Sequence, residues 1–174
     1  MKNDYQGFSL VELVVTIAFI GILLTIASLN FSSWQQKYNI ENQAKEMMTD
    51  LNDLRMRAIQ TKSKHVAVLS SNPMLMTFRS YSAEEPVTLT TGRQVFTKSL
   101  KYPISSNAAS VTACGDIGIT TRGLTQDFQV GGTFNSNQTM YILPTETGAS
   151  LDCLVISDTR INLGKFNGST CSFQ

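Results

Sequence analysis

The chain has 174 residues, of which 42% are hydrophobic and 9% aromatic, and its formal net charge at neutral pH is +1. This composition is typical of a folded protein and excludes a chain that is disordered throughout. The near-neutral charge excludes a general electrostatic attraction to nucleic acid or to anionic lipid.

The first predicted element is an apolar helix near the N-terminus. Residues 13–31 carry no charge, and at about 1.5 Å rise per residue they match the hydrocarbon core of a bilayer, about 30 Å thick. Glu12 directly precedes this run, and a carboxylate in hydrocarbon is costly enough to indicate a functional role. A cleaved secretory signal, with Thr25 and Ala27 before the cut, fits poorly because Glu12 interrupts a long apolar region. A plain membrane anchor would leave Glu12 unpaired in lipid.

The residues around Glu12 form an ordered motif. Residues 7–13 read G-F-S-L-V-E-L, which resembles the G-F-[ST]-L-x-E-L signal of type IV pilins and type II secretion pseudopilins. The resemblance implies that a prepilin peptidase removes the leader, residues 1–7, by cutting between Gly7 and Phe8, and that Phe8 is then N-methylated. It also implies a single-pass inner-membrane protein with its C-terminal domain in the periplasm. With other pilins or pseudopilins and an inner-membrane assembly platform, it would later be incorporated into, or initiate, a type IV pilus or a type II secretion pseudopilus.

The same resemblance gives Glu12 a partner. Cleavage creates a free α-amine on Phe8, and in a filament with its apolar helices bundled at the centre, Glu12 of one subunit can meet a neighbour's amine. Removing one partner of such a buried pair costs about 3–5 kcal/mol. We therefore expect Glu12 to favour one axial register during assembly.

Residues 32–62 are predicted to continue the helix as an amphipathic stalk. Neither glycine nor proline occurs in residues 22–71, so one helix from residue 8 to about residue 62 is expected. Apolar residues recur at spacings of three and four, which places them on one face. They are Phe31, Trp34, Tyr38, Met47, Met48, Leu51, Leu54, Ala58 and Ile59. We expect residues 8–31 to form the membrane-spanning or filament-core half, and the stripe to pack on a domain or on neighbouring stalks.

Residues 63–174 are predicted to form an antiparallel β domain. Short apolar or alternating runs are separated by Gly, Asn, Ser and Pro, which is the pattern of short strands joined by turns. The runs are residues 65–69, 74–81, 93–100, 117–120, 128–130, 140–143 and 153–156, with turns at 131–132 and 147–149. The expected fold class is α+β, a pilin fold in which a long N-terminal helix packs on an antiparallel sheet.

Three further segments resemble the GspH/FimT branch of the pilin superfamily. Residues 51–59, L-N-D-L-R-M-R-A-I, resemble its L-x-x-L-x-x-A-R-x-x-A-I helix pattern. Residues 120–124 resemble its mid-domain F-x-x-x-G segment, and residues 155–162 resemble its V-V-S-x-x-G-R-[VI]-R strand. The resemblance implies a minor pilin or pseudopilin, with a major filament subunit as the alternative.

In some members of that branch, the G-R-x-R motif implies capture of DNA during natural transformation. Here Arg160 is retained, whereas Thr159 and Asn162 replace the glycine and the second arginine, and Lys165 is a candidate substitute. The loss of one phosphate contact among several weakens such binding substantially. A DNA-binding tip subunit is therefore a second alternative, with nucleic-acid contact at Arg160 and Lys165.

The three cysteines, Cys114, Cys153 and Cys171, all lie in the C-terminal third. An oxidising periplasm allows a disulfide, and an odd count leaves at least one thiol free or paired with another chain. Cys153 and Cys171 bracket the last predicted strand pair, so their pairing is favoured, although Cys114 could compete for either partner. This bridge would close a loop of about 19 residues and contribute about 3 kcal/mol.

The sequence contains no recognisable catalytic or metal-binding constellation. It has no Ser-His-Asp elbow, phosphate-binding glycine loop or CxxC motif, and its single histidine has no companion ligand at metal spacing. We expect that histidine, His65, at the end of the helix or on the surface, and Glu84 and Glu85 in a solvated loop. The expectation is a structural protein without catalytic residues, metal or cofactor.

Overall fold

The structure is a computed structural model that describes residues 9–71, 74–82, 92–112, 114–125 and 138–173. The chain divides into two compact units, Met1–Gln36 and Lys37–Gln174. Helix α1 (Leu10–Thr61) begins in the first unit and ends in the second. The predicted leader, residues 1–7, lies outside the described residues, as do the predicted strand at 128–130, the turn at 131–132, and Glu84 and Glu85.

The first unit is helical from Leu10 onward, and its large apolar side chains between Leu10 and Ile26 are exposed by 45–79%. Two hydroxyls in this stretch bond back to the helix: Thr16 Oγ1 donates to the Leu13 carbonyl and Thr25 Oγ1 to the Gly21 carbonyl, each at 2.8 Å. Such bonds satisfy a hydroxyl without water. The helix surface is therefore apolar apart from Glu12 at its start.

In the second unit, α1 buries one face. Its buried apolar residues follow the alternating spacings of four and three that define a single helical stripe; they are Ile40, Ala44, Met47, Leu51, Leu54 and Ala58. The predicted stripe was partly wrong, because Tyr38 and Ile59 are exposed. Tyr38 lies two positions from Ile40, about 200° around the helix, and Ile59 lies about 100° from Ala58, so neither shares the buried face.

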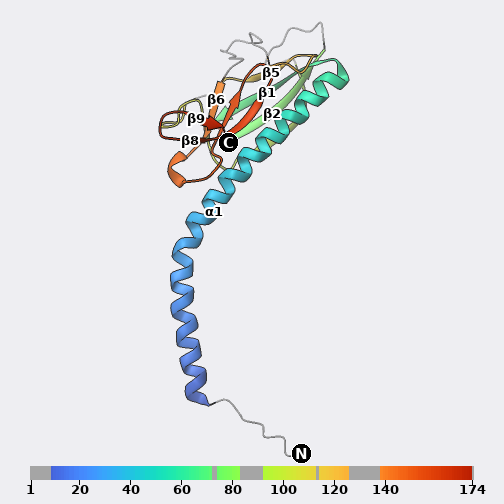
Figure 1. Ribbon diagram of the computed structural model, residues 1–174. Helices are drawn as coiled ribbons and strands as arrows, with labels where there is room; N and C mark the ends of the chain where they lie inside the picture. The colour runs from blue at the N-terminus through green and yellow to red at the C-terminus, as the bar shows by residue number, and fades with distance from the viewer. Residues whose placement is uncertain (1–8, 72–73, 83–91, 113, 126–137, 174) are drawn as a thin grey trace, which may run out of the picture. The chain divides into compact units, whose positions relative to one another are not determined.

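Two antiparallel sheets pack with this part of α1 around a single core (Figure 1). The first sheet has the order β3-β2-β1-β5. Its strands are β1 (Lys64–Ser71), β2 (Met74–Tyr81), β3 (Arg93–Ser99) and β5 (Ile117–Ile119). The second sheet has the order β4-β6-β7-β8-β9. Its strands are β4 (Ile104–Ser105), β6 (Gln138–Ile142), β7 (Cys153–Ile156), β8 (Ile161–Phe166) and β9 (Cys171–Phe173). The α+β fold, a long N-terminal helix on antiparallel sheets, is therefore confirmed and is consistent with a pilin fold.

The core joins the helix stripe to both sheets. It includes Met76 and Phe78 from β2, Ile119 from β5 and Leu154 from β7, all fully buried. The ring of Phe96 stacks on that of Phe78, with 4.0 Å between the centroids. This packing holds the part of α1 that belongs to the second unit and the β-strands in one body.

Two sequence expectations about this unit were wrong. Residues 155–162, likened to one strand, form a reversal: β7 ends at Ile156, the Ser157 amide donates to the Arg160 carbonyl at 2.8 Å, and β8 begins at Ile161. His65 is not at the helix end or on the surface, because it belongs to β1 and is only 3% exposed. Burial lowers the pKa of His65, and the nearby positive charge of Arg57 acts in the same direction.

Candidate functional site

The predicted cleavage and methylation residues, Gly7 and Phe8, lie outside the described residues, but the helix that follows them is described. It begins at Leu10, and its first hydrogen bond runs from the Leu13 amide to the Ser9 carbonyl at 3.2 Å. Glu12 lies in the first turn, where a carboxylate interacts favourably with the helix dipole. The structure therefore presents Glu12 close to the predicted new N-terminus.

Glu12 is exposed, and it is the only charged residue of the first unit beyond position 8. No described residue of this chain forms an ion pair with it. Its neighbours Val11 and Leu13 are 68% and 53% exposed. Because this part of the helix is exposed, a cationic group of another chain can pair with the Glu12 carboxylate without any rearrangement of this chain.

A polar clamp, which we define as Gln43, Glu46, Asp50 and Lys98 with the backbone of residues 101–102, ties the β domain to the stalk. Gln43 Oε1 accepts from the amides of Lys101 and Tyr102 at 3.0 and 2.9 Å, and its Nε2 donates to the Tyr102 carbonyl at 2.8 Å. The three bonds use a side chain that is only 6% exposed. Sequence reasoning missed Gln43 because nothing local signals a contact with residues far along the chain.

Lys98 completes the polar clamp from β3. Its Nζ lies 2.9 Å from Asp50 Oδ2 and 3.2 Å from Glu46 Oε2. Desolvation acts to lower the pKa of Lys98, but its hydrogen bonds to Asp50 and Glu46 outweigh that effect and raise it. The ammonium group therefore stays charged and holds the sheet edge against the helix.

The three segments that resemble the GspH/FimT branch meet at one end of the β domain. Arg55 Nη1 donates to the Thr159 carbonyl at 3.2 Å, and the Thr125 amide donates to the Asp158 carbonyl at 2.9 Å. Gly123 has a φ of +78°, and a Cβ there would lie 2.7 Å from Ile59 Cδ1. The three segments that carry the resemblance therefore pack together in a junction between the end of α1 and two turns.

Within this junction, the Arg55 guanidinium is under-satisfied. Its Nε and Nη2 atoms are buried and have no hydrogen-bond partner among the described residues. Desolvation by burial lowers the pKa of Arg55. The Arg55 side chain is therefore part of the packing of this junction, although Arg57, Arg122 and Arg160 of the same three segments are exposed.

The structure does not bring Arg160 and Lys165 together. Arg160 is exposed in the turn before β8, and Lys165 is exposed near the other end of that strand. At about 3.3 Å per residue of extended chain, five positions separate the two residues by up to about 16 Å. The two cations therefore form no joint patch for a phosphate backbone.

Cys153 and Cys171 form a disulfide, the pairing favoured from the sequence. It crosses β8, because β7 and β9 lie on either side of that strand. Gly164 of β8 makes this crossing possible, since a Cβ there would lie 2.5 Å from the Ser172 carbonyl oxygen and 2.7 Å from Cys171 Sγ. The bridge attaches the short edge strand β9 to the sheet.

Cys114 has a free thiol and is half-buried. Burial raises its pKa to about 12. The thiolate is the nucleophile in disulfide exchange, so a thiol that stays protonated at neutral pH is unreactive. Cys114 therefore does not compete effectively for Cys153 or Cys171.

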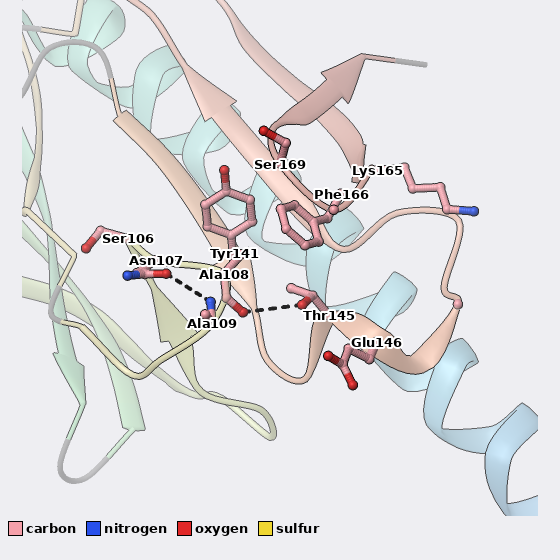
Figure 2. Close-up of a pocket in the computed structure, with 12 residues that line it drawn as sticks. Ser106, Asn107, Ala108, Ala109, Tyr141, Thr145, Glu146, Lys165, Phe166 and Ser169 are labelled. Atoms are coloured by element: carbon pink, nitrogen blue, oxygen red, sulfur yellow. Dashed lines mark hydrogen bonds between the residues drawn. The ribbon is translucent and has the colours of Figure 1, made fainter.

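The β domain also contains an open cavity of about 740 Å³ (Figure 2). Its lining comes from residues 106–109, from the turn around the 3₁₀ helix η1 (Thr145–Thr147) and from the β8–β9 hairpin. Tyr141 and Phe166 meet edge to face inside it, with ring centroids 5.4 Å apart. Thr145 Oγ1 donates to the Ala108 carbonyl at 3.3 Å. Sequence reasoning missed the cavity because segments far apart in the chain form it.

A protein-family model described as the prokaryotic N-terminal methylation motif matches residues 2–28. No curated protein and no solved structure matches the chain. Among the described residues, no single helix is long and apolar enough to cross a membrane. The bent pair Leu10–Ile26 and Phe31–Thr61 meets that requirement together, by length and composition. The chain therefore carries a type IV pilin-like prepilin signal at its N-terminus, which fits localisation at a membrane.

Proposed function

We propose that this protein is a structural subunit, a minor pilin or pseudopilin, of a type IV pilus or a type II secretion pseudopilus. The observation that carries the proposal is the methylation motif at residues 2–28, which covers the exposed apolar stretch of α1 from Leu10 to Ile26, where Glu12 is the one charge. A prepilin peptidase hydrolyses the bond between Gly7 and Phe8. The leader leaves with the new carboxylate, and Phe8 keeps the new α-amine. A sulfonium methyl donor then transfers its methyl group to that amine and leaves as a thioether, and the amine releases one proton.

Glu12 acts during assembly. The methylated amine of Phe8 stays cationic, and Glu12 of a neighbouring subunit pairs with it as the apolar helices bundle. Because an unpaired charge inside the bundle costs about 3–5 kcal/mol, subunits dock in the register that forms the pair. The protein stays in the inner membrane, with its β domain in the periplasm, until the assembly platform extracts it.

The second unit supports a structural role. The polar clamp and the disulfide fix the β domain to the stalk and close its edge. The helix-end junction, built from the segments that resemble the GspH/FimT branch, supports a minor subunit over a major one. The separation of Arg160 and Lys165 does not favour a DNA-binding tip subunit.

Processing is tested by expressing the full chain in cells with and without a prepilin peptidase and determining the mass of its N-terminal peptide. We expect a peptide that begins at Phe8 and carries one added methyl group only when the peptidase is present. A Gly7→Val variant, whose branched side chain alters the cleavage position, should keep the leader. An unprocessed N-terminus in the presence of the peptidase, or a cut elsewhere, contradicts the proposal.

A further inference from the structure

Two aromatic residues lie at the end of the first unit. The side chains of Phe31 and Trp34 are 58% and 60% exposed, and their ring centroids are 6.0 Å apart. A spacing of three places them on the same side of the helix. Trp34 is the only tryptophan in the chain. Large exposed rings that contact each other form an apolar surface on this side of the helix.

The position of this pair along the helix matches the thickness of a membrane. Trp34 follows Glu12 by 22 positions, and no charged residue lies between them. At about 1.5 Å per residue the two are about 33 Å apart along the helix path, against about 30 Å for a hydrocarbon core. If Glu12 lies at one boundary of the core, Trp34 therefore lies at the other, and Lys37 is the next charge beyond it.

We propose that Phe31 and Trp34 anchor the unassembled protein at the outer lipid headgroup layer and thereby hold Glu12 at the inner boundary. The inference rests on the proposed membrane-inserted subunit. Tryptophan favours this layer because its large amphipathic ring lies at the level of the headgroups. Glu12 then keeps contact with water before assembly, and leaves it only when a partner amine is in place.

Because Trp34 is the only tryptophan, its fluorescence in the full chain reports its depth directly. The protein is reconstituted into phosphatidylcholine vesicles in which the lipid carries bromine atoms at a shallow, intermediate or deep acyl position. We expect the shallow bromines to quench Trp34 most and the deep bromines least. The matched control is the double variant Leu23→Trp, Trp34→Phe, since Leu23 lies midway between Glu12 and Trp34 and is 65% exposed. Its order of quenching should be reversed.

The outcomes separate the anchor from the proposed function. Strongest quenching of Trp34 by the deep bromines overturns the anchor, provided the control tryptophan is quenched by them as expected. No quenching of Trp34 by any brominated lipid, together with protection from an aqueous quencher, means that the ring packs on protein and also overturns it. If neither protein floats with the vesicles, the membrane-inserted subunit itself fails, and the anchor fails with it.

Discussion

At the residue scale, single side chains decide whether close contacts are possible. Gly164 lies where the disulfide crosses β8, with the Ser172 carbonyl oxygen only 2.5 Å from the position of an added Cβ. A backbone atom in a paired strand cannot move away as a side chain can. The strand therefore depends on glycine at this position for packing and not for backbone flexibility.

We expect Gly164→Ala to lower the free energy of unfolding by about 1–3 kcal/mol through overpacking. The measurement is denaturant unfolding of the full chain in detergent, followed by near-ultraviolet circular dichroism. Gly21→Ala is the control, because a Cβ at Gly21 meets nothing within 4 Å. Equal stability of Gly164→Ala and the wild type would contradict the close contact at β8.

His65 makes stability depend on pH. Its pKa is lowered in the folded state by burial, so the unfolded chain binds the proton more readily. The stability of the fold should therefore fall as pH decreases from about 6.5, the unperturbed histidine value, towards the lowered pKa. His65 is the only histidine, so its single imidazole NMR signal should titrate below about pH 6.5.

The matched variant is His65→Gln, which should unfold with a smaller change in stability between about pH 7.5 and about pH 5.5 than the wild type. The quantity compared is the change in the free energy of unfolding between the two pH values. A loss of stability that is equal at both pH values therefore does not affect the result. An NMR midpoint at or above the ordinary value for histidine would show that His65 is not held neutral by burial.

At the element scale, the helix and the β domain are joined by polar contacts as much as by the core. The three hydrogen bonds of Gln43 satisfy both amides and one carbonyl at the start of the segment that leads into β4. Backbone groups left without partners in a buried place carry their full desolvation penalty. The polar clamp therefore contributes more than its partly exposed ion pairs alone.

Gln43→Leu should destabilise the protein by at least about 2 kcal/mol, because two amides and one carbonyl lose their partner. Denaturant unfolding of the full chain measures this. Gln60→Leu makes the same change on an exposed position of α1 and should have little effect. A loss no larger than that of Gln60→Leu would contradict the role given to Gln43.

Strands with alternating or continuous apolar residues were predictable from the sequence, and short or polar strands were not. The ranges 74–81 and 153–156 predicted from alternating or continuous apolar residues are those of β2 and β7. The bounds of β4, β8 and β9 were not predicted, because these strands are short or polar, although a strand pair was expected between Cys153 and Cys171. The bridge between these two cysteines attaches β9 to the sheet. The predicted stripe on α1 wrongly included Tyr38 and Ile59, which have apolar side chains but do not lie on the buried face of the helix.

At the scale of the whole molecule, the two units have different roles in the proposed account. The first unit carries the prepilin signal and an apolar helix surface that another chain or a membrane must cover. The second unit has its own core, its own disulfide and its own contacts with α1. The motif that identifies the first unit was readable from the sequence, because its chemistry depends on neighbouring residues. The cavity and the polar clamp were not, because they depend on contacts between distant segments.

The central claim is that Glu12 acts in assembly and not in processing, and the incorporation of Glu12→Ala into filaments tests it most directly. The variant and the wild type are expressed at equal levels in cells that make the filament, and the sheared filaments and the N-terminal masses are compared. We predict that Glu12→Ala loses residues 1–7 as the wild type does but is nearly absent from filaments. A processed Glu12→Ala protein that enters filaments at the wild-type level would contradict the account.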